Sequence, residues 1–299
     1  MKFHAQQAFR SFILLGFSVM LFKLHFTGEI TKFINPKYQG LSQAASVLFL
    51  ILFFIQVTRI WTAKENRHHH HCQHDDHDCS HDHGNTPFNT KKLIGYLVII
   101  FPLITGLLFP AKVLDASIAD KKGGMAVLSN QKILKEEKKK NSNQEVPNAT
   151  PVKIGNSKEL SKEEYEQLKQ SLIESPIIKM NDDVFSAYYE EIHMDLPTFK
   201  GREIELTGFV YRDQGLEQNQ LVLARFLITH CAADANIIGF MSELPEASTL
   251  EENTWIEARG ILDTTTFNGT ELPFIKITEW KEIKEPTAPY LYPISVRIL

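Results

Sequence analysis

The stretch "EIELTGFVY", from Glu203 to Tyr211, alternates polar and apolar residues and carries Gly208 inside the pattern. A second stretch, "WIEARGIL", from Trp255 to Leu262, repeats both features with Gly260. Alternation with a period of two indicates a strand, and an interior glycine is typical of a point where a small sheet bends. The two stretches therefore predict a small, strongly curved β domain.

Three further strand-like runs lie at residues 220–229, 237–241 and 274–280, and turn residues at 213–215, 245 and 268–269 separate most of the runs. Five short strands with interior glycines predict an OB-like barrel. Ahead of them, Ser161 and Glu164 form a capping box that opens a helix to about residue 171. A strand at 177–180 and a helix at 182–192 are also expected. We therefore predict a mainly-β, OB-like barrel domain at 161–299 with one or two flanking helices.

The first 110 residues are apolar and predict a membrane α domain of three transmembrane helices. The apolar segments run over residues 11–26, 41–61 and 93–109, close to the length that crosses a hydrocarbon core about 30 Å thick. The first segment could also be a signal peptide, but no small-x-small cleavage site follows it, so we expect an uncleaved span.

Lysine and arginine flank the first span on its N-terminal side and border the loop at 64–92, which predicts that the N-terminus and this loop are cytoplasmic. The β domain at 161–299 is then extracytoplasmic. The stretch at 111–160 is charged and poor in aromatic residues, so we predict a linker there.

The loop contains "RHHHHCQHDDHDCSHDHG", from Arg67 to Gly84, which holds eight of the chain's 12 histidines and two of its three cysteines. Imidazole and thiolate are preferred ligands of Zn²⁺, and aspartates attract cations. The spacing is irregular, so it predicts a fluxional loop rather than one tetrahedral site. A solvated loop that binds metal without functional consequence remains the alternative. The candidate ligands are His68, His69, His70, His71, Cys72, His74, Asp75, His77, Cys79, His81 and His83.

A second candidate site lies in "RFLITHCAADA", where His230, Cys231 and Asp234 fall within five residues at the end of a predicted strand. They could ligate a metal or contact a partner. Alternatively, Cys231 is a small buried residue and Asp234 caps a turn. His25, at the end of the first span, is a third candidate metal ligand, with an interfacial histidine as the alternative.

Several classes of function are disfavoured. No nucleophile elbow, P-loop, H-E-x-x-H or dinucleotide fingerprint is present, so we predict that the protein is not an enzyme. Residues 201–281 hold six Lys and Arg against thirteen Asp and Glu, a balance that repels phosphate, so no nucleic-acid partner is expected.

The segments "LHFTGEITKFINPKY" (Leu24 to Tyr38), the histidine-rich loop, "GFVYRD" and "ARFLITHCAADA" together resemble the DUF1980, or YcgQ-like, family of bacterial permease subunits. The resemblance covers nearly the whole chain. It implies the small subunit of a two-component membrane complex, paired with a larger multi-span permease of the UPF0718 type. Family members often carry a second cysteine at the position of His230, so this departure weakens a vicinal-dithiol interpretation and leaves a His/Cys/Asp ligand set open.

These observations together predict a membrane-bound accessory subunit of a permease complex that handles a transition metal, with Zn²⁺ as the expected ion. The alternative is an envelope-stress or assembly factor whose OB-like domain binds a protein, with metal incidental. The identity of the metal, the direction of transport and the stoichiometry are open at this stage.

Overall fold

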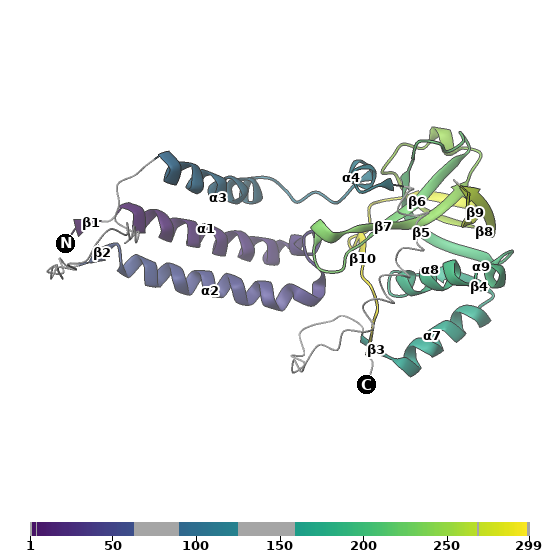
Figure 1. The fold of residues 1–299 in the computed structure, drawn as a ribbon, viewed down its shortest axis with the longest axis horizontal. Helices are drawn as coiled ribbons and strands as arrows, with labels where there is room; N and C mark the ends of the chain where they lie inside the picture. The colour runs from purple at the N-terminus through teal and green to yellow at the C-terminus, as the bar shows by residue number, and fades with distance from the viewer. Residues whose placement is uncertain (1, 4, 63–89, 125–158, 268, 298–299) are drawn as a thin grey trace, which may run out of the picture. The chain divides into compact units, whose positions relative to one another are not determined.

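The computed structural model describes residues 2–3, 5–62, 90–124, 159–267 and 269–297 (Figure 1). The chain divides into two compact units. The helical unit contains Met1–Ile30 and Gln39–Ala111, and the β unit contains Thr31–Tyr38 and Lys112–Leu299. The β unit thus includes Thr31–Tyr38, a short segment that lies in the sequence between two parts of the helical unit.

The helical unit is built from α1 (Ala5–Thr27), α2 (Gln39–Thr58) and α3 (Thr90–Leu108), with short strands β1 (Lys2–Phe3) and β2 (Trp61–Thr62) pairing at one end. Two stretches, Gln6–Thr27 and Pro36–Thr58, are long and apolar enough to cross a membrane. The apolar part of α3, Ile94–Leu108, is helical but shorter. The structure therefore supports two apolar spans by length and composition, and the third stays a prediction.

Polar contacts connect α1 and α2 at three levels along their length. The Gln56 amide donates to Gln7 Oε1, Ser18 Oγ donates to the Ser46 carbonyl at 3.0 Å, and His25 Nε2 lies 3.2 Å from Ser42 Oγ. The rest of the outward surface of these helices is largely apolar and exposed, for example at Phe12 and Val47. This distribution suits membrane helices that join through a few polar contacts and leave an apolar surface for lipid.

The β unit is organised around one seven-stranded sheet in the order β10-β6-β7-β9-β8-β5-β4. Its strands are β4 (Ile177–Met180), β5 (Glu203–Tyr211), β6 (Gln220–Leu227), β7 (Asn236–Glu243), β8 (Trp255–Phe267), β9 (Thr270–Ile283) and β10 (Tyr290–Leu291). Strand β5 also pairs with β6, so the pairings β5–β6–β7–β9–β8 return to β5. All five predicted strands are present, and within this ring only β7 and β9 run parallel.

Glycines allow the backbones of this sheet to approach closely. A Cβ atom at Gly239 would lie 2.3 Å from the Leu223 carbonyl oxygen, and one at Gly260 would lie 2.3 Å from the Lys276 carbonyl oxygen. Gly260 also sits at a register shift between β8 and β9. The predicted bend at this glycine therefore coincides with an irregularity in the strand pairing.

Helices cover one face of the sheet. They are α7 (Lys162–Glu174), α8 (Phe185–Met194) and α9 (Leu196–Phe199), and Leu172, Phe185 and Ile192 are fully buried among strand residues. The predicted capping box is present, because Glu164 N donates to Ser161 Oγ and Ser161 N donates to the Glu164 carboxylate. A further strand, β3 (Glu159–Ser161), pairs with β11 (Ser295–Arg297).

The opposite face of the sheet is covered by a segment that the sequence predicted to be linker. Within residues 112–121, which we call the strap, α4 (Ala116–Lys121) buries Ala116 and Ala119 against Tyr211 and other strand residues. The strap is anchored where Ala116 N donates to Asn253 Oδ1 at 2.7 Å and Leu114 N donates to the Tyr290 hydroxyl at 2.9 Å. The first part of the expected linker at 111–160 is thus ordered on the β unit, and residues 125–158 lie outside the described residues.

Candidate functional site

The histidine-rich loop falls within residues 63–89, which lie outside the described residues. All of its candidate ligands, from His68 to His83, therefore stay predictions. Within the described parts of the chain, no group of three or more His, Cys, Asp or Glu side chains is placed to hold a metal ion. The structure thus offers no direct test of the zinc hypothesis at the loop.

His25 lies in the last turn of α1, where its Nε2 atom is 3.2 Å from Ser42 Oγ of α2. Its ring is engaged in a contact between two helices of the same unit. A hydrogen bond across two helices stabilises a polar group between them, and the metal role of His25 stays a prediction.

The segment after β6 brings His230, Cys231 and Asp234 into one tight turn. The strand ends at Leu227, and a short 3-10 helix follows at Ala232–Asp234. The Asp234 carboxylate accepts hydrogen bonds from His230 N at 2.9 Å, Cys231 N at 3.3 Å and His230 Nδ1 at 2.8 Å. The three predicted residues are therefore close together. The Asp234 carboxylate points back into the turn and accepts hydrogen bonds from the other two residues.

These hydrogen bonds favour the ionised form of Asp234. Burial raises the pKa of this carboxyl group, but the bonds from the His230 side chain and from the His230 and Cys231 backbones outweigh it, so the net pKa is below its ordinary value. The ring of His230 has its Nδ1 atom directed to the carboxylate, and its side chain is 65% exposed. Its second nitrogen, Nε2, forms no hydrogen bond with the described residues, and the carboxylate fixes the orientation of the ring.

A segment nearly 200 residues earlier completes this turn. Ile34 forms a β-bridge with Cys231, and two backbone bonds flank it: Asn35 N to His230 O at 2.9 Å and Ala232 N to Phe33 O at 2.8 Å. The ring of Tyr38 stacks on that of His230 with centroids 5.7 Å apart. Residues Thr31–Tyr38 therefore add a short strand-like edge to the turn, and we call the two together the rim platform.

Asn35 is the main polar anchor of the rim platform. Its side chain, 5% exposed, donates to the carbonyls of Ile228 at 3.3 Å and Thr229 at 3.0 Å, and it accepts from Lys37 N at 2.9 Å. Lys122, the residue directly after the strap, reaches the same turn, since its Nζ donates to the Ala233 carbonyl at 2.9 Å. Sequence reasoning did not single out Asn35. The Asn35–Pro36 pair was the available signal, because such pairs are typical of turns.

Cys231 is half-buried and its thiol forms no disulfide. Its backbone carries the contacts to Ile34 and Asp234, so the residue is neither a deeply buried core cysteine nor a freely exposed thiol. The geometry fits the predicted alternative in which Asp234 caps a turn. It offers one oriented imidazole and one thiol, fewer than the three protein ligands usual for zinc.

Sequence reasoning also missed Arg225, which is 1% exposed in the middle of β6. Its guanidinium forms an ion pair with Asp182 at 2.8 Å, donates to the Pro289 carbonyl at 3.2 Å and lies 5.2 Å from the ring centroid of Trp255. The signal for Arg225 in the sequence was a charged residue inside an otherwise apolar strand pattern. The ion pair and the hydrogen bond satisfy the guanidinium, as burial of this group requires.

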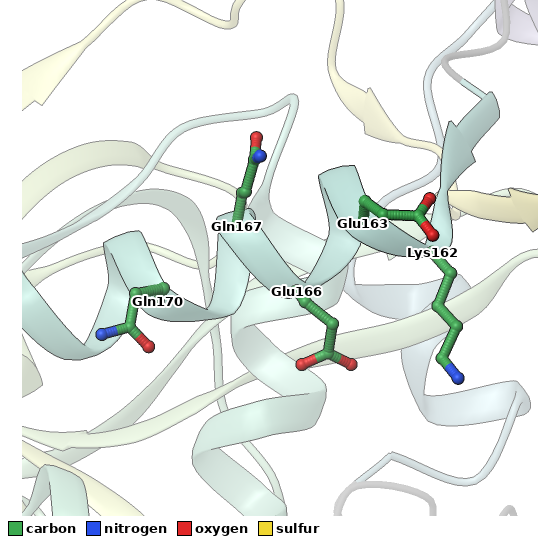
Figure 2. A pocket seen from close by; sticks show the side chains of 5 residues that line it. All are labelled: Lys162, Glu163, Glu166, Gln167 and Gln170. Atoms are coloured by element: carbon green, nitrogen blue, oxygen red, sulfur yellow. The ribbon is translucent and has the colours of Figure 1, made fainter.

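The surface of α7 carries a shallow hollow lined by Lys162, Glu163, Glu166, Gln167 and Gln170 (Figure 2). Figure 2 shows these side chains spread along the helix without converging on one point. None of them belongs to the candidate residues above, and the hollow contributes nothing to the rim platform.

Comparison with known proteins identifies relatives along the whole chain. The DUF1980 N-terminal domain matches residues 9–125, and the DUF1980 C-terminal domain matches residues 155–293. The UPF0703 protein YcgQ of Bacillus subtilis (strain 168) is 34% identical over 289 residues, covering 95% of this chain and 99% of that protein. A protein of Streptococcus mutans serotype c, provisionally named a two-component membrane permease complex subunit, is 24% identical over 289 residues, covering 95% of this chain and 98% of that relative.

Proposed function

Because the chain belongs to the DUF1980 family, we propose that it is a membrane-anchored accessory subunit of a two-component permease complex. The relative named as a permease complex subunit matches nearly the full length of both chains, which supports the same role here. The membrane helices anchor the subunit, and the β unit acts on one side of the bilayer.

The observation that carries this proposal is the place of Thr31–Tyr38 in the β unit. This segment joins α1 to α2, so it emerges on one side of the membrane if those helices span it. Its bridge to Cys231 requires the β unit to be on the same side. The chain leaves α2 on the other side and must cross once more to reach the β unit, and α3 supplies that third crossing.

This topology separates the histidine-rich loop from the β unit by the thickness of the bilayer. The loop lies between α2 and α3, with lysine and arginine at both borders, which favours the cytoplasm for the loop and the outside for the β unit. The density of imidazole and thiolate favours a transition metal, most simply zinc, as the ion handled at the loop.

The ring of strand pairings supports an OB-like barrel in the β unit, because β5 pairs with both β6 and β8. The rim platform lies at one end of β6, on a loop region where binding function is common in such folds. Since Asp234 is committed to the turn, we assign the platform to contact with the permease rather than to metal.

The apolar helices carry few polar side chains, and several of these bond between α1 and α2, which leaves the helices unsuited to form a conduction path alone. A partner with its own pathway is therefore part of the proposal. We expect the tagged full-length chain, isolated from its native membranes in mild detergent, to carry a multi-span permease in a fixed ratio, measured by quantitative mass spectrometry. Recovery of the chain without such a protein, or from the soluble fraction, would contradict the proposal.

The metal part has its own test. Replacing the eight loop histidines with asparagine should alter cellular zinc content as deletion of the gene does, while the permease still co-purifies. Replacing the loop aspartates alone with asparagine is the matched control and should have a smaller effect, because imidazole is the stronger zinc ligand. Unchanged zinc content in the histidine variant would remove zinc from the account and leave the permease role intact.

A further inference from the structure

The strap covers a face of the sheet that is rich in aromatic rings. Phe209 stacks on Phe226 with ring centroids 5.5 Å apart, and Trp255 meets Phe209 edge to face at 5.8 Å. These rings share one buried cluster with Ala116 and Ala119 of the strap. In OB folds the face of the second and third barrel strands takes the ligand, and β6 and β7 hold these places in the ring of pairings. The strap therefore lies where such a fold binds its ligand.

The strap does not fill this face completely. A cavity of about 210 Å³ remains between the strap on one side and Phe209 and Trp255 on the other. The strap buries only small side chains fully, the two alanines of α4. Its backbone is held by two side chains of the β unit, Asn253 and Tyr290. Segments with few buried apolar contacts separate from a fold at lower free energy than its core does.

At its far end the strap is held by a hydroxyl group that two carboxylates share. The Tyr211 hydroxyl lies 2.7 Å from Asp120 Oδ1 of α4 and 3.0 Å from Asp213 Oδ2 of the loop after β5. A hydroxyl group has one hydrogen to donate, so it forms a full hydrogen bond with only one of the two. Burial and the two carboxylates raise the pKa of Tyr211, so this hydrogen stays on the tyrosine.

The two carboxylates also oppose each other. Both contact the same hydroxyl oxygen, so their oxygens lie within about 6 Å of each other, where like charges repel. Two cations nearby in the chain, Lys122 and Arg212, donate to backbone carbonyls instead. Closing the strap therefore brings Asp120 to a hydroxyl group that it shares with a like charge.

We propose that the strap is a releasable cover, which leaves the face of β6 and β7 and returns to it while the rest of the β unit stays folded. The Tyr211 hydroxyl favours the closed state by bonding to Asp120, and the charge of Asp213 opposes it. Opening uncovers the aromatic rings and breaks the bond from Lys122 to the turn of the rim platform. Every residue of this device belongs to the β unit, so the device does not depend on the proposed permease role.

Amide hydrogen exchange of the full-length chain at neutral pH, resolved by residue, tests the cover directly. The Leu114 and Ala116 amides donate to side chains of the β unit, so they exchange when the strap leaves the sheet. We expect both to be roughly tenfold less protected than the Leu223 amide in the middle of β6. Equal protection would show that the strap separates only when the sheet unfolds, and would overturn the proposal. The Leu223 amide also reports whether each variant keeps the sheet folded.

Substitutions at the shared hydroxyl group test its role. Asp213→Asn removes the opposing charge, so the Leu114 and Ala116 amides should exchange about threefold more slowly. Tyr211→Phe removes the hydroxyl group and keeps both charges, so exchange should become about fivefold faster. Glu217→Gln is the matched control, because Glu217 is exposed in the same loop as Asp213 and loses the same charge, and it should leave the rates unchanged.

Two results would overturn the role given to this contact. One is an Asp213→Asn chain whose strap exchanges as fast as that of the native chain or of the control. The other is a Tyr211→Phe chain whose strap exchanges no faster than the native one.

Discussion

Asp234 stabilises the rim platform through three donors on one carboxylate. Replacing it with asparagine keeps the size of the side chain but removes the charge and one acceptor. We expect Asp234→Asn to cost about 1 kcal/mol locally, as the loss of a capping side chain does. Hydrogen exchange of the His230 and Cys231 amides in the full-length chain should become roughly fivefold faster near neutral pH.

The same substitution has a predictable pH dependence. The pKa of Asp234 is lowered in the folded protein, so its stabilisation is present above the unfolded value and is lost as pH falls through the lower folded value. The difference in exchange between Asp234→Asn and the native chain should therefore shrink as pH falls below the ordinary range of an aspartate and vanish once the folded carboxyl group is protonated. A difference that persists undiminished in acid would show that the carboxylate charge is not what stabilises the turn.

Asn35 joins the segment Thr31–Tyr38 to the turn after β6. Asn35→Ala leaves the two carbonyls that it bonds without a donor, at a cost of about 1–3 kcal/mol if they stay buried. We expect faster proteolysis and exchange across Thr31–Tyr38. Asn236→Ala is the matched control, because Asn236 is exposed at the start of β7. Equal effects of the two substitutions would contradict the assigned role of Asn35.

For single residues, the sequence indicated the turn at His230–Asp234 but not the segment Thr31–Tyr38 that pairs with it. His230, Cys231 and Asp234 could be grouped because they are neighbours in the chain, and Asp234 capping was among the alternatives. The pairing of Ile34 with Cys231 joins residues almost 200 positions apart, and a single sequence carries no local signal for such a contact. For the same reason the stacking of Tyr38 on His230 was not foreseen.

At the scale of elements, Gly239 permits the close contact of β6 and β7. Gly239→Ala would place a methyl group 2.3 Å from the Leu223 carbonyl oxygen, so the backbones must separate. We expect the free energy of unfolding to fall by about 1–3 kcal/mol, measured by chemical denaturation of the full-length chain in detergent.

Gly95→Ala in α3 is the counterpart of this substitution, since a Cβ there meets nothing within 4 Å. Alanine favours helix over glycine by about 1 kcal/mol, so this change should be neutral or stabilising. A Gly239→Ala chain as stable as the native one would show that the sheet is not closely packed at β6 and β7.

The elements themselves were largely predictable. Strand alternation located all five central strands to within a few residues, and the capping box at Ser161 marked the start of α7. The strap was not predicted, because its six-residue helix is too short for periodicity to reveal and lies in a lysine-rich context. Its order comes from tertiary burial of Ala116 and Ala119, which outweighs the local composition.

At the scale of the whole molecule, the account depends on which side of the membrane each part occupies. The segment Thr31–Tyr38 belongs to the β unit, so under the proposed three-span topology the two share a side and the histidine-rich loop lies across the bilayer from both. With the loop and the β unit on opposite sides, α1, α2 and α3 would each cross the membrane once. The proposed permease role rests on the family relatives, and the proposed metal role of the loop can fail without it.

The most direct test is cysteine labelling of intact cells. Single cysteines are compared in a chain without other cysteines: Lys37→Cys in the α1–α2 connection, Ser248→Cys on the exposed surface of the β unit, and native Cys72 in the loop. An impermeant maleimide should label the first two in sealed cells and reach Cys72 only after permeabilisation. Labelling of Lys37→Cys and Ser248→Cys from opposite sides, or of Cys72 in sealed cells, would contradict the account.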